Sequence, residues 1–422
     1  MNPVELNGRQ YRLPSRQTVV ICADGCDPAY IEAGLAAGVL PTIAKWRDRG
    51  FYALADAVMP TFTNPNNMSI VTGAPPSVHG IAGNFALDRD SGAEVMMTDP
   101  AMLRSETILA LMSQAGIPTA AITAKDKLRS MLGRGLTIGD SGICFSSEQA
   151  DRCTPEEHGI AAVEALVGRA KPDMYSADLS LFVLDAGIRL VEQGRSQLLY
   201  LSLSDYVQHG HAPDEPEALA FHQALDERLA RLAELGCVVA LTADHGMNDK
   251  ALADGRPHVL YLEDILNAHF GAGAARVICP ITDPFVRHHG ALGSFVRVYC
   301  NKGAVPGLDP GIATMRHAIR ALPGIDSVLT REEACAVFEL PQDREADLVV
   351  TGDRNTVIGA TAAEHDLSAL AGHRLRSHGG AFEQRVPFLL SHLLTAEYRA
   401  TSESRALRNF DIFDFALNGI VP

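Results

Sequence analysis

Candidate metal ligands follow three short apolar runs of the sequence. Asp24 comes after TVVICA, Asp205 after LLYLSLS and Asp244 after CVVALTA. An imidazole accompanies two of these carboxylates, because His209 lies four residues after Asp205 and His245 directly follows Asp244. A lone aspartate at such a position usually starts a turn or caps a helix. Three of them, together with histidines that are typical zinc ligands, predict a metal site instead.

His378 is the candidate ligand from the late part of the chain. Two glycines follow it, and they let the backbone approach closely and expose the imidazole. The nearby His373 lacks these glycines and is the weaker candidate. A glycine also follows His245, where a turn is needed because adjacent side chains diverge on a regular strand.

The segment MPTFTNPNNMSIVTG contains a candidate nucleophile. Pro65 suits a first helical turn, so Thr63 or Asn64 is expected at or next to the cap, with a helix over 66–72 that Gly73 ends. A hydroxyl at a helix N-terminus lies in a positive field, which favours its alkoxide. Without the metal ligands, the simpler interpretation of Thr63 is an N-cap.

Lys125 and Lys127 follow another apolar run, PTAAIT. In an extended loop, residues two apart face the same way, so two ammonium groups could hold an anion with several charges. Two solvated surface lysines are an equally good interpretation of the sequence alone.

The apolar runs alternate with helical patterns, such as 216–235, which ends near Gly236. Continuously apolar runs suit strands buried on both faces, so the alternation predicts an α/β fold with a mostly parallel sheet. Sites in such sheets lie outside the carboxyl ends of the strands, where the three aspartates would meet. The runs are 18–23, 118–123, 198–204, 237–243, 296–300 and 386–390.

The stretch between Asp244 and His378 is richer in Gly, Pro and charge than the rest. We expect 251–371 to be an insert containing a cap, between core segments 1–250 and 372–422.

The net charge of −15 argues against a nucleic-acid partner. Scattered cysteines, no secretion signal and no long apolar run favour a cytoplasmic protein with no membrane span.

With these segments in order, the sequence resembles the alkaline phosphatase superfamily, in its nucleotide pyrophosphatase/phosphodiesterase-like branch. The resemblance implies an alkaline phosphatase-like core, in which helices flank a mostly parallel central sheet, plus an inserted cap. The matching pieces are Asp24-Gly25, Thr63-Asn-Pro-Asn, V-T-G-x-x-P-x-x-H-G ending at Gly80, Asn84, Asp205-x-x-x-His209, Asp244-His245-Gly246-Met247 and His378-Gly379.

The resemblance also implies a set of site residues. Two zinc ions are expected, although ligands of mixed N/O type suit manganese or iron as well. Asn84 would hydrogen-bond a phosphoryl oxygen, Lys125 and Lys127 would hold substrate oxygens, and Arg287 is a further substrate contact. The implied zinc ligands are Asp24, Thr63, Asp244 and His245 at one site, and Asp205, His209 and His378 at the other.

Within that branch, stretches such as TAKDKLR and LSDYVQHGHAP are similar to enzymes that cleave the carbon–phosphorus bond of phosphonoacetate. The implied activity is hydrolysis to acetate and phosphate, with Thr63 as the nucleophile of a phosphoenzyme. The implied partner is a small phosphonate, and a homodimer is a family-level expectation. The alternatives are a phosphodiesterase or nucleotide pyrophosphatase on the same scaffold and, less favoured, a non-catalytic metal-binding protein.

Overall fold

The computed structural model of the protein describes residues 2–88, 91–139, 141–283, 290–301, 311–370 and 373–421. Arg287, predicted above as a substrate contact, lies outside the described residues. Among the described helices, none is both long enough and apolar enough to cross a bilayer.

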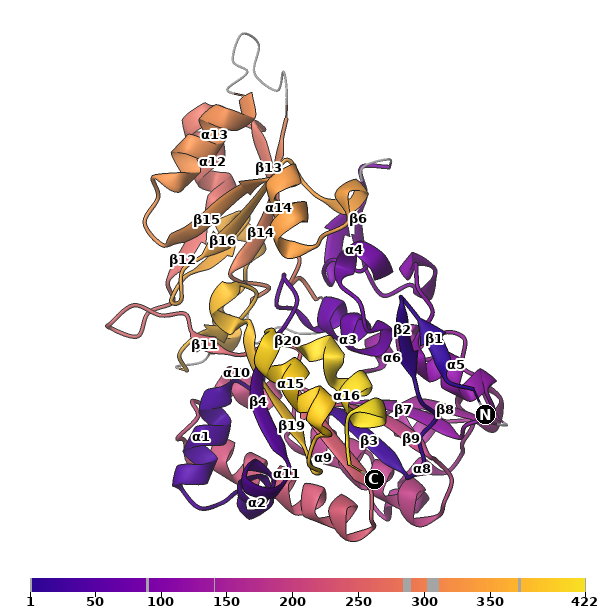
Figure 1. The fold of residues 1–422 in the computed structure, drawn as a ribbon. Helices are drawn as coiled ribbons and strands as arrows, with labels where there is room; N and C mark the ends of the chain where they lie inside the picture. Colours follow the sequence, from indigo (N-terminus) through magenta and orange to yellow (C-terminus); the bar gives the residue numbers. More distant parts are fainter. Residues whose placement is uncertain are drawn as a thin grey trace.

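An eight-stranded sheet forms the centre of the larger part of the molecule (Figure 1). Four neighbours, β10, β3, β9 and β7, run parallel, as does β8 at one edge, whereas β19 is antiparallel to β10. The predicted α/β fold with a mostly parallel central sheet is therefore confirmed. In spatial order, the strands are β20 (Leu407–Arg408), β4 (Phe51–Asp56), β19 (Arg385–Leu390), β10 (Val238–Thr242), β3 (Thr18–Cys22), β9 (Leu198–Ser202), β7 (Thr119–Thr123) and β8 (Gly142–Ser146).

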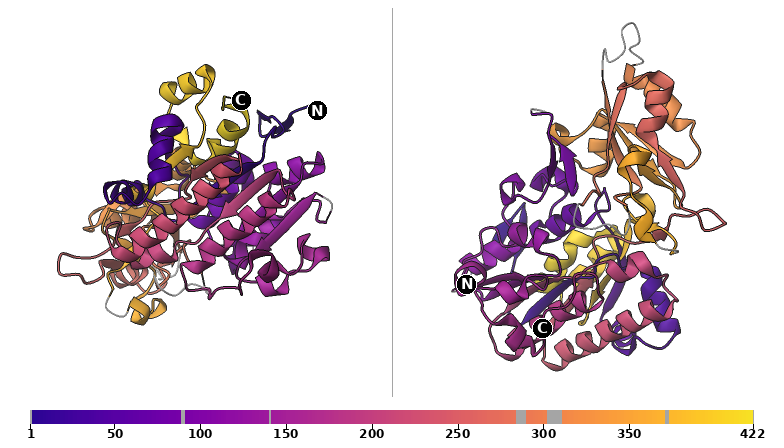
Figure 2. Two further views of the ribbon diagram at one scale, coloured as in Figure 1. Left: turned by 90° about the horizontal axis from the view of Figure 1, so that it is seen from below. Right: turned by 180° about the vertical axis from the view of Figure 1, so that it is seen from behind.

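Helices cover both faces of this sheet, which explains why its central strands are buried along their whole length and mostly apolar. All residues of β3, β7, β9 and β10 are buried. α9 (Asp178–Glu192) packs on α11 (Pro216–Glu234) behind the sheet, while α16 (Ile412–Asn418) lies in front of it (Figures 1 and 2). α11 starts with Pro216 and ends before Gly236, as the sequence predicts.

The remaining described α-helices are all shorter than α9 and α11. They are α1 (Pro28–Ala36), α2 (Pro41–Arg49), α3 (Thr63–Thr72), α4 (Pro76–His79), α5 (Ile108–Gln114), α6 (Asp126–Leu132), α7 (Pro155–His158), α8 (Val163–Val167), α10 (Tyr206–Gly210), α12 (Leu262–Phe270), α13 (Gly311–Arg320), α14 (Arg331–Phe338) and α15 (Ala396–Ser404). The described residues also form four two-stranded sheets: β1 (Val4–Leu6) with β2 (Arg9–Tyr11), β5 (Phe85–Leu87) with β6 (Glu94–Met96), β11 (Asn248–Asp249) with β18 (Arg376–Ser377), and β12 (Val259–Tyr261) with β17 (Val357–Gly359).

A second, antiparallel sheet lies above the central one in Figure 1, in orange. Run 296–300 belongs here rather than to the parallel sheet, so its placement among the core strands was wrong. Neighbouring strands of the second sheet are antiparallel and bury an apolar cluster of their own. This pairing joins segments far apart in the sequence, so the sequence pattern of the run does not reveal it. All four lie within the predicted insert 251–371, whose boundaries stay a prediction. They are β13 (Ala275–Ile278), β14 (Phe295–Cys300), β16 (Leu348–Gly352) and β15 (Ile325–Thr330).

One fully buried ion pair lies beside this second core. Arg297 on β14 donates from Nε and Nη2 to the two carboxylate oxygens of Glu345, at 2.7 and 2.9 Å. Both side chains are 0% exposed. The Arg297 Nη2 also donates to the carbonyl of Ala82, so the pair joins the second sheet to the segment before Asn84.

Replacing Arg297 alone leaves the Glu345 carboxylate buried without this counter-ion. We expect Arg297→Met to lower the free energy of unfolding by about 3–5 kcal/mol. The double variant Arg297→Met/Glu345→Leu buries neither charge and should recover most of that loss. Urea unfolding followed by circular dichroism measures both, and a double variant as unstable as the single one would contradict this explanation.

Candidate metal centre

The three strand-end aspartates reach one edge of the central sheet because their strands are adjacent and in register. Cys22, at the end of β3, lies opposite Ser202 of β9 on one side and Thr242 of β10 on the other. Asp24, Asp205 and Asp244 follow these strand ends within three residues. All three are buried, with relative exposures of 3, 5 and 0%.

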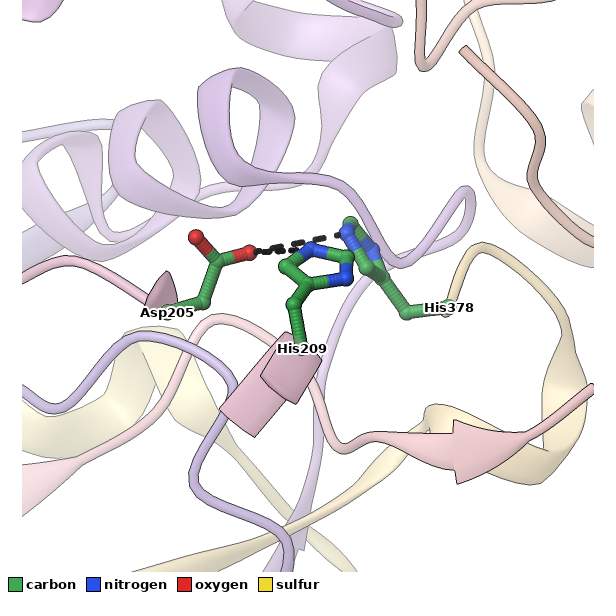
Figure 3. Close-up of side chains that lie close together, drawn as sticks. All are labelled: Asp205, His209 and His378. Carbon is green, nitrogen blue, oxygen red and sulfur yellow. Dashed lines mark ion pairs between the residues drawn. The ribbon is translucent and has the colours of Figure 1, made fainter. Parts of the chain in front are cut away.

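Asp205, His209 and His378 form one cluster, in which the three side chains point toward one another (Figure 3). The Asp205 Oδ2 lies 2.9 Å from Nε2 of His209 and 3.8 Å from Nε2 of His378. His209 reaches this position because Asp205 occupies the N-cap position of the short helix α10, which places residues four apart on one side. These are the three residues of one predicted zinc site.

A second cluster contains Asp24, Asp205 and His245. The His245 Nε2 lies 3.2 Å from Oδ1 of Asp24 and 3.8 Å from Oδ2 of Asp244. Asp244 also accepts a hydrogen bond from the backbone N–H of Gly25, at 3.2 Å. Asp205 thus lies between the two groups, and the carboxylates of the other predicted site surround His245.

Each of the three imidazoles is oriented by a backbone carbonyl. A carbonyl only accepts, so Nδ1 carries a proton, and Nε2, which faces the carboxylates, is the nitrogen left to bind a cation. This is the tautomer that binds a metal through Nε2. The pairs are His209 with the carbonyl of Arg376 at 2.8 Å, His378 with Thr61 at 2.7 Å, and His245 with Gly246 at 2.9 Å.

The polar atoms of these clusters fit a bound cation. Among the described residues, neither Asp24 Oδ1 nor His245 Nε2 has a well-directed hydrogen bond, although both atoms are buried. Burial and the adjacent carboxylate of Asp24 raise the pKa of Asp244 well above its usual range. Burial opposes charge on His245 too, yet the neighbouring Asp244 and Asp24 raise its pKa to about 10. Divalent ions would relieve this crowding of carboxylates.

The helix that bears Thr63 starts earlier than expected. α3 begins at Thr63 itself, not at residue 66, and Phe62 occupies the cap position, so the N-cap interpretation of Thr63 is wrong. The backbone N–H of Asn64 is instead satisfied by the side-chain oxygen of Asn84, at 3.2 Å. Gly73 ends the helix in a left-handed conformation, as predicted. Thr63, a half-buried residue, therefore has no capping role.

Asn67, one turn along α3, joins this helix to the metal centre. Its Nδ2 donates to the carbonyl of Thr63 at 3.0 Å and to Oδ2 of Asp244 at 3.4 Å. Its Oδ1 accepts from the hydroxyls of Tyr200 and Ser202, at 2.7 and 2.9 Å, which fixes the orientation of the amide. Asn67 carries no signal in the sequence, because nothing in its spacing distinguishes it from a helix-surface asparagine.

The two predicted anion-binding lysines occupy different surroundings. Lys125 lies 3.7 Å from Oδ1 of Asp205, and Lys127 forms an ion pair with the buried Asp283. The expected extended loop is wrong, since α6 begins at Asp126, directly after Lys125. Burial lowers the pKa of Lys125, but Asp205 and Asp24 outweigh it and raise the pKa, so the ammonium stays charged.

Asn84 and His373 complete the predicted residues. Asn84 is buried beside the start of α3, and its backbone N–H donates to the carbonyl of Pro280 at 2.9 Å. The exposed His373 does not belong to either buried cluster, and its ring lies 6.3 Å from that of His211.

Comparison with known proteins is consistent with this geometry. The model of the type I phosphodiesterase/nucleotide pyrophosphatase family matches residues 18–380. The structure is similar to phosphonoacetate hydrolase from Sinorhizobium meliloti in complex with phosphonoformate, with 46% identity, 99% of each chain covered and a TM-score of 0.92. The complex of that enzyme with phosphonoacetate gives 45% identity, 99% coverage of each chain and the same TM-score of 0.92.

Two more distant comparisons extend this pattern. A 30-residue stretch is 67% identical to phosphonoacetate hydrolase of Penicillium oxalicum, and it spans 7% of this chain and 42% of that sequence. Murine ectonucleotide pyrophosphatase/phosphodiesterase 5 shares the fold, with a TM-score of 0.60 at 16% identity over 96% of each chain. The chain belongs to the type I phosphodiesterase/nucleotide pyrophosphatase family.

Proposed function

We propose that the protein hydrolyses the carbon–phosphorus bond of phosphonoacetate to give acetate and phosphate. The observation that carries this proposal is the similarity over 99% of the chain, at 46% identity, to a phosphonoacetate hydrolase. Two features of the site support it independently. The buried Asp/His clusters suit divalent cations, and the Lys125 ammonium beside them suits an anionic substrate.

Two ions, with zinc as the first choice, fit the donor set. Asp205, His209 and His378 would hold one ion. Asp24, Asp244 and His245 would hold the other, with Thr63 as a further ligand. When bound, two such ions supply positive charge to the phosphonate oxygens and favour ionisation of a nearby hydroxyl. Carboxylate and imidazole ligands also accept manganese or iron, which only metal analysis can distinguish.

Thr63 is the proposed nucleophile. Its position at the first turn of α3 places the hydroxyl in the positive field of the helix N-terminus, which stabilises the alkoxide. Its Oγ1 attacks phosphorus as the carbon–phosphorus bond breaks, and the bonding pair leaves with the methylene carbon. That carbon takes a proton to give acetate, and water then hydrolyses the phosphothreonine to phosphate and regenerates the hydroxyl.

Asn84 and the two lysines act on the substrate in this proposal. The hydrogen bond from Asn64 fixes the side-chain oxygen of Asn84, so the amide nitrogen is the group that donates to a phosphoryl oxygen. Lys125 and Lys127 would hold the substrate carboxylate. As carbon departs, negative charge spreads onto that carboxylate, and a fixed ammonium stabilises it most at that moment.

The second candidate function is a phosphodiesterase or nucleotide pyrophosphatase, which family membership favours. It would use the same ligands and nucleophile but would bind a nucleoside or ester group instead of a carboxylate.

We also propose a cytoplasmic location, which the eight free cysteines support. The expected homodimer stays a prediction.

A two-substrate comparison tests the function. We expect the zinc-replete protein to cleave phosphonoacetate with a kcat/KM at least about tenfold above that for a nitrophenyl phosphodiester. The reason is that the diester has no carboxylate for Lys125 and Lys127 to bind. Chelator treatment should abolish both activities, and zinc should restore them. A preference for the diester would favour the second candidate function.

Thr63→Ala removes the nucleophile but none of the Asp or His ligands. We expect kcat for phosphonoacetate to fall by at least about a thousandfold, while metal content measured by mass spectrometry stays near that of the unaltered protein. Thr63→Ser keeps a hydroxyl and should retain much of the activity. Unchanged turnover in the alanine variant would exclude Thr63 as the nucleophile.

Lys127→Met tests recognition of the carboxylate. A hydrogen bond to a charged group contributes about 1.5–3 kcal/mol, so kcat/KM for phosphonoacetate should fall roughly 10- to 150-fold. An aryl phosphate ester, which has no carboxylate, should lose much less. Lys171→Met, at a surface lysine paired with Asp151, is the control and should change neither value. Equal losses for both substrates in Lys127→Met would argue against the assigned role.

A further inference from the structure

The imidazoles of His245 and His378 stack face to face. Their ring centroids are 3.5 Å apart and the ring planes differ by 7°. The two histidines come from segments far apart in the sequence, and in the proposed function they bind different ions. The relative position of these two segments therefore sets the spacing between the two ligand groups.

Glu383 makes hydrogen bonds to both segments. Its backbone carbonyl accepts from the N–H of Gly246, next to His245, at 2.7 Å. Its carboxylate Oε2 accepts from the N–H of Gly380, two residues after His378, at 3.1 Å. The side chain is 0% exposed, so no water competes for these bonds. A single residue thus holds the backbone beside each stacked imidazole.

The other carboxylate oxygen of Glu383 is also fully used. Its Oε1 accepts from Nδ2 of Asn248 at 2.6 Å and from Nζ of Lys250 at 2.8 Å. Asn248 lies on β11, which pairs with β18 just before His378. The hydrogen bond from Asn248 to Glu383 therefore also holds the segment of His245 against the segment of His378. Lys250 is 0% exposed and donates further to the carbonyl of Arg354 at 2.9 Å.

This arrangement requires a carboxylate. Three side-chain or backbone donors point at the two oxygens, in addition to the contact through the backbone carbonyl. A glutamine offers one oxygen, so its NH₂ group would face either the N–H of Gly380 or the donors of Asn248 and Lys250. A buried ion pair is also a costly way to fill space, since apolar side chains of similar volume often give equal or greater stability.

We propose that Glu383 is a positioning residue that sets the spacing between the two metal sites, with Lys250 as its counter-ion. The proposal rests on the two-metal function proposed above. Residues that orient metal ligands typically change metal affinity about 10- to 100-fold when they are altered. Glu383 acts here on the backbone of two ligand segments at once, so its loss should weaken the binding of both ions.

The test is zinc affinity, measured on the full chain after chelator treatment by competition with a chromogenic chelator. We expect Glu383→Gln to bind both zinc ions about 10- to 100-fold more weakly than the unaltered protein. Glu345→Gln is the matched control, because Glu345 is equally buried and its carboxylate is paired with the buried cation of Arg297 in the second sheet. Its zinc affinity should stay unchanged.

The double variant Lys250→Met/Glu383→Leu separates positioning from stability. It buries no unpaired charge, so circular dichroism should report a folded protein, yet its zinc affinity should stay low. Unchanged affinity in Glu383→Gln, an equal loss in Glu345→Gln, or recovered affinity in the double variant would each overturn the proposal. No substrate is present in this measurement, so failure of the proposed reaction would not affect its outcome.

Discussion

Repulsion among three buried carboxylates is the constraint on which the rest of this structure depends. Asp24, Asp205 and Asp244 follow adjacent parallel strands and meet at one edge of the sheet. Burial removes the water that would otherwise screen their charge, and the pKa of Asp244 rises well above its usual range. Such a site is stable when cations offset the charge, which is why we interpret it as a two-metal centre.

The surrounding elements keep this charged group in place. The carbonyls of Arg376, Thr61 and Gly246 hold Nδ1 of the three histidines and so orient the rings, with every Nε2 facing a carboxylate. Asn67 then joins the first turn of α3 to Asp244, which couples the proposed nucleophile to the metal ligands. The geometry of the site therefore depends largely on contacts between residues that are far apart in the sequence.

Apolar runs ending in aspartate predicted the central sheet and its functional edge, because buried parallel strands leave a clear sequence pattern. Local sequence patterns gave wrong predictions where contacts between distant residues determine the structure. α3 starts at Thr63 because Asn84 satisfies its N-terminus, and run 296–300 pairs with β13 and β16 in the second sheet. Glu383 left no signal, since its partners are brought to it only by the fold. Whether all seven predicted ligands bind metal stays a prediction.

The most direct test of this account is phosphorus NMR of phosphonoacetate incubated with metal-free protein and increasing zinc. The phosphonate signal should be replaced by that of inorganic phosphate, with one acetate formed per phosphate in the proton spectrum. The rate should rise until two zinc ions are bound per chain and then level off. No phosphate release at any zinc content, or full activity with one ion bound, would contradict it.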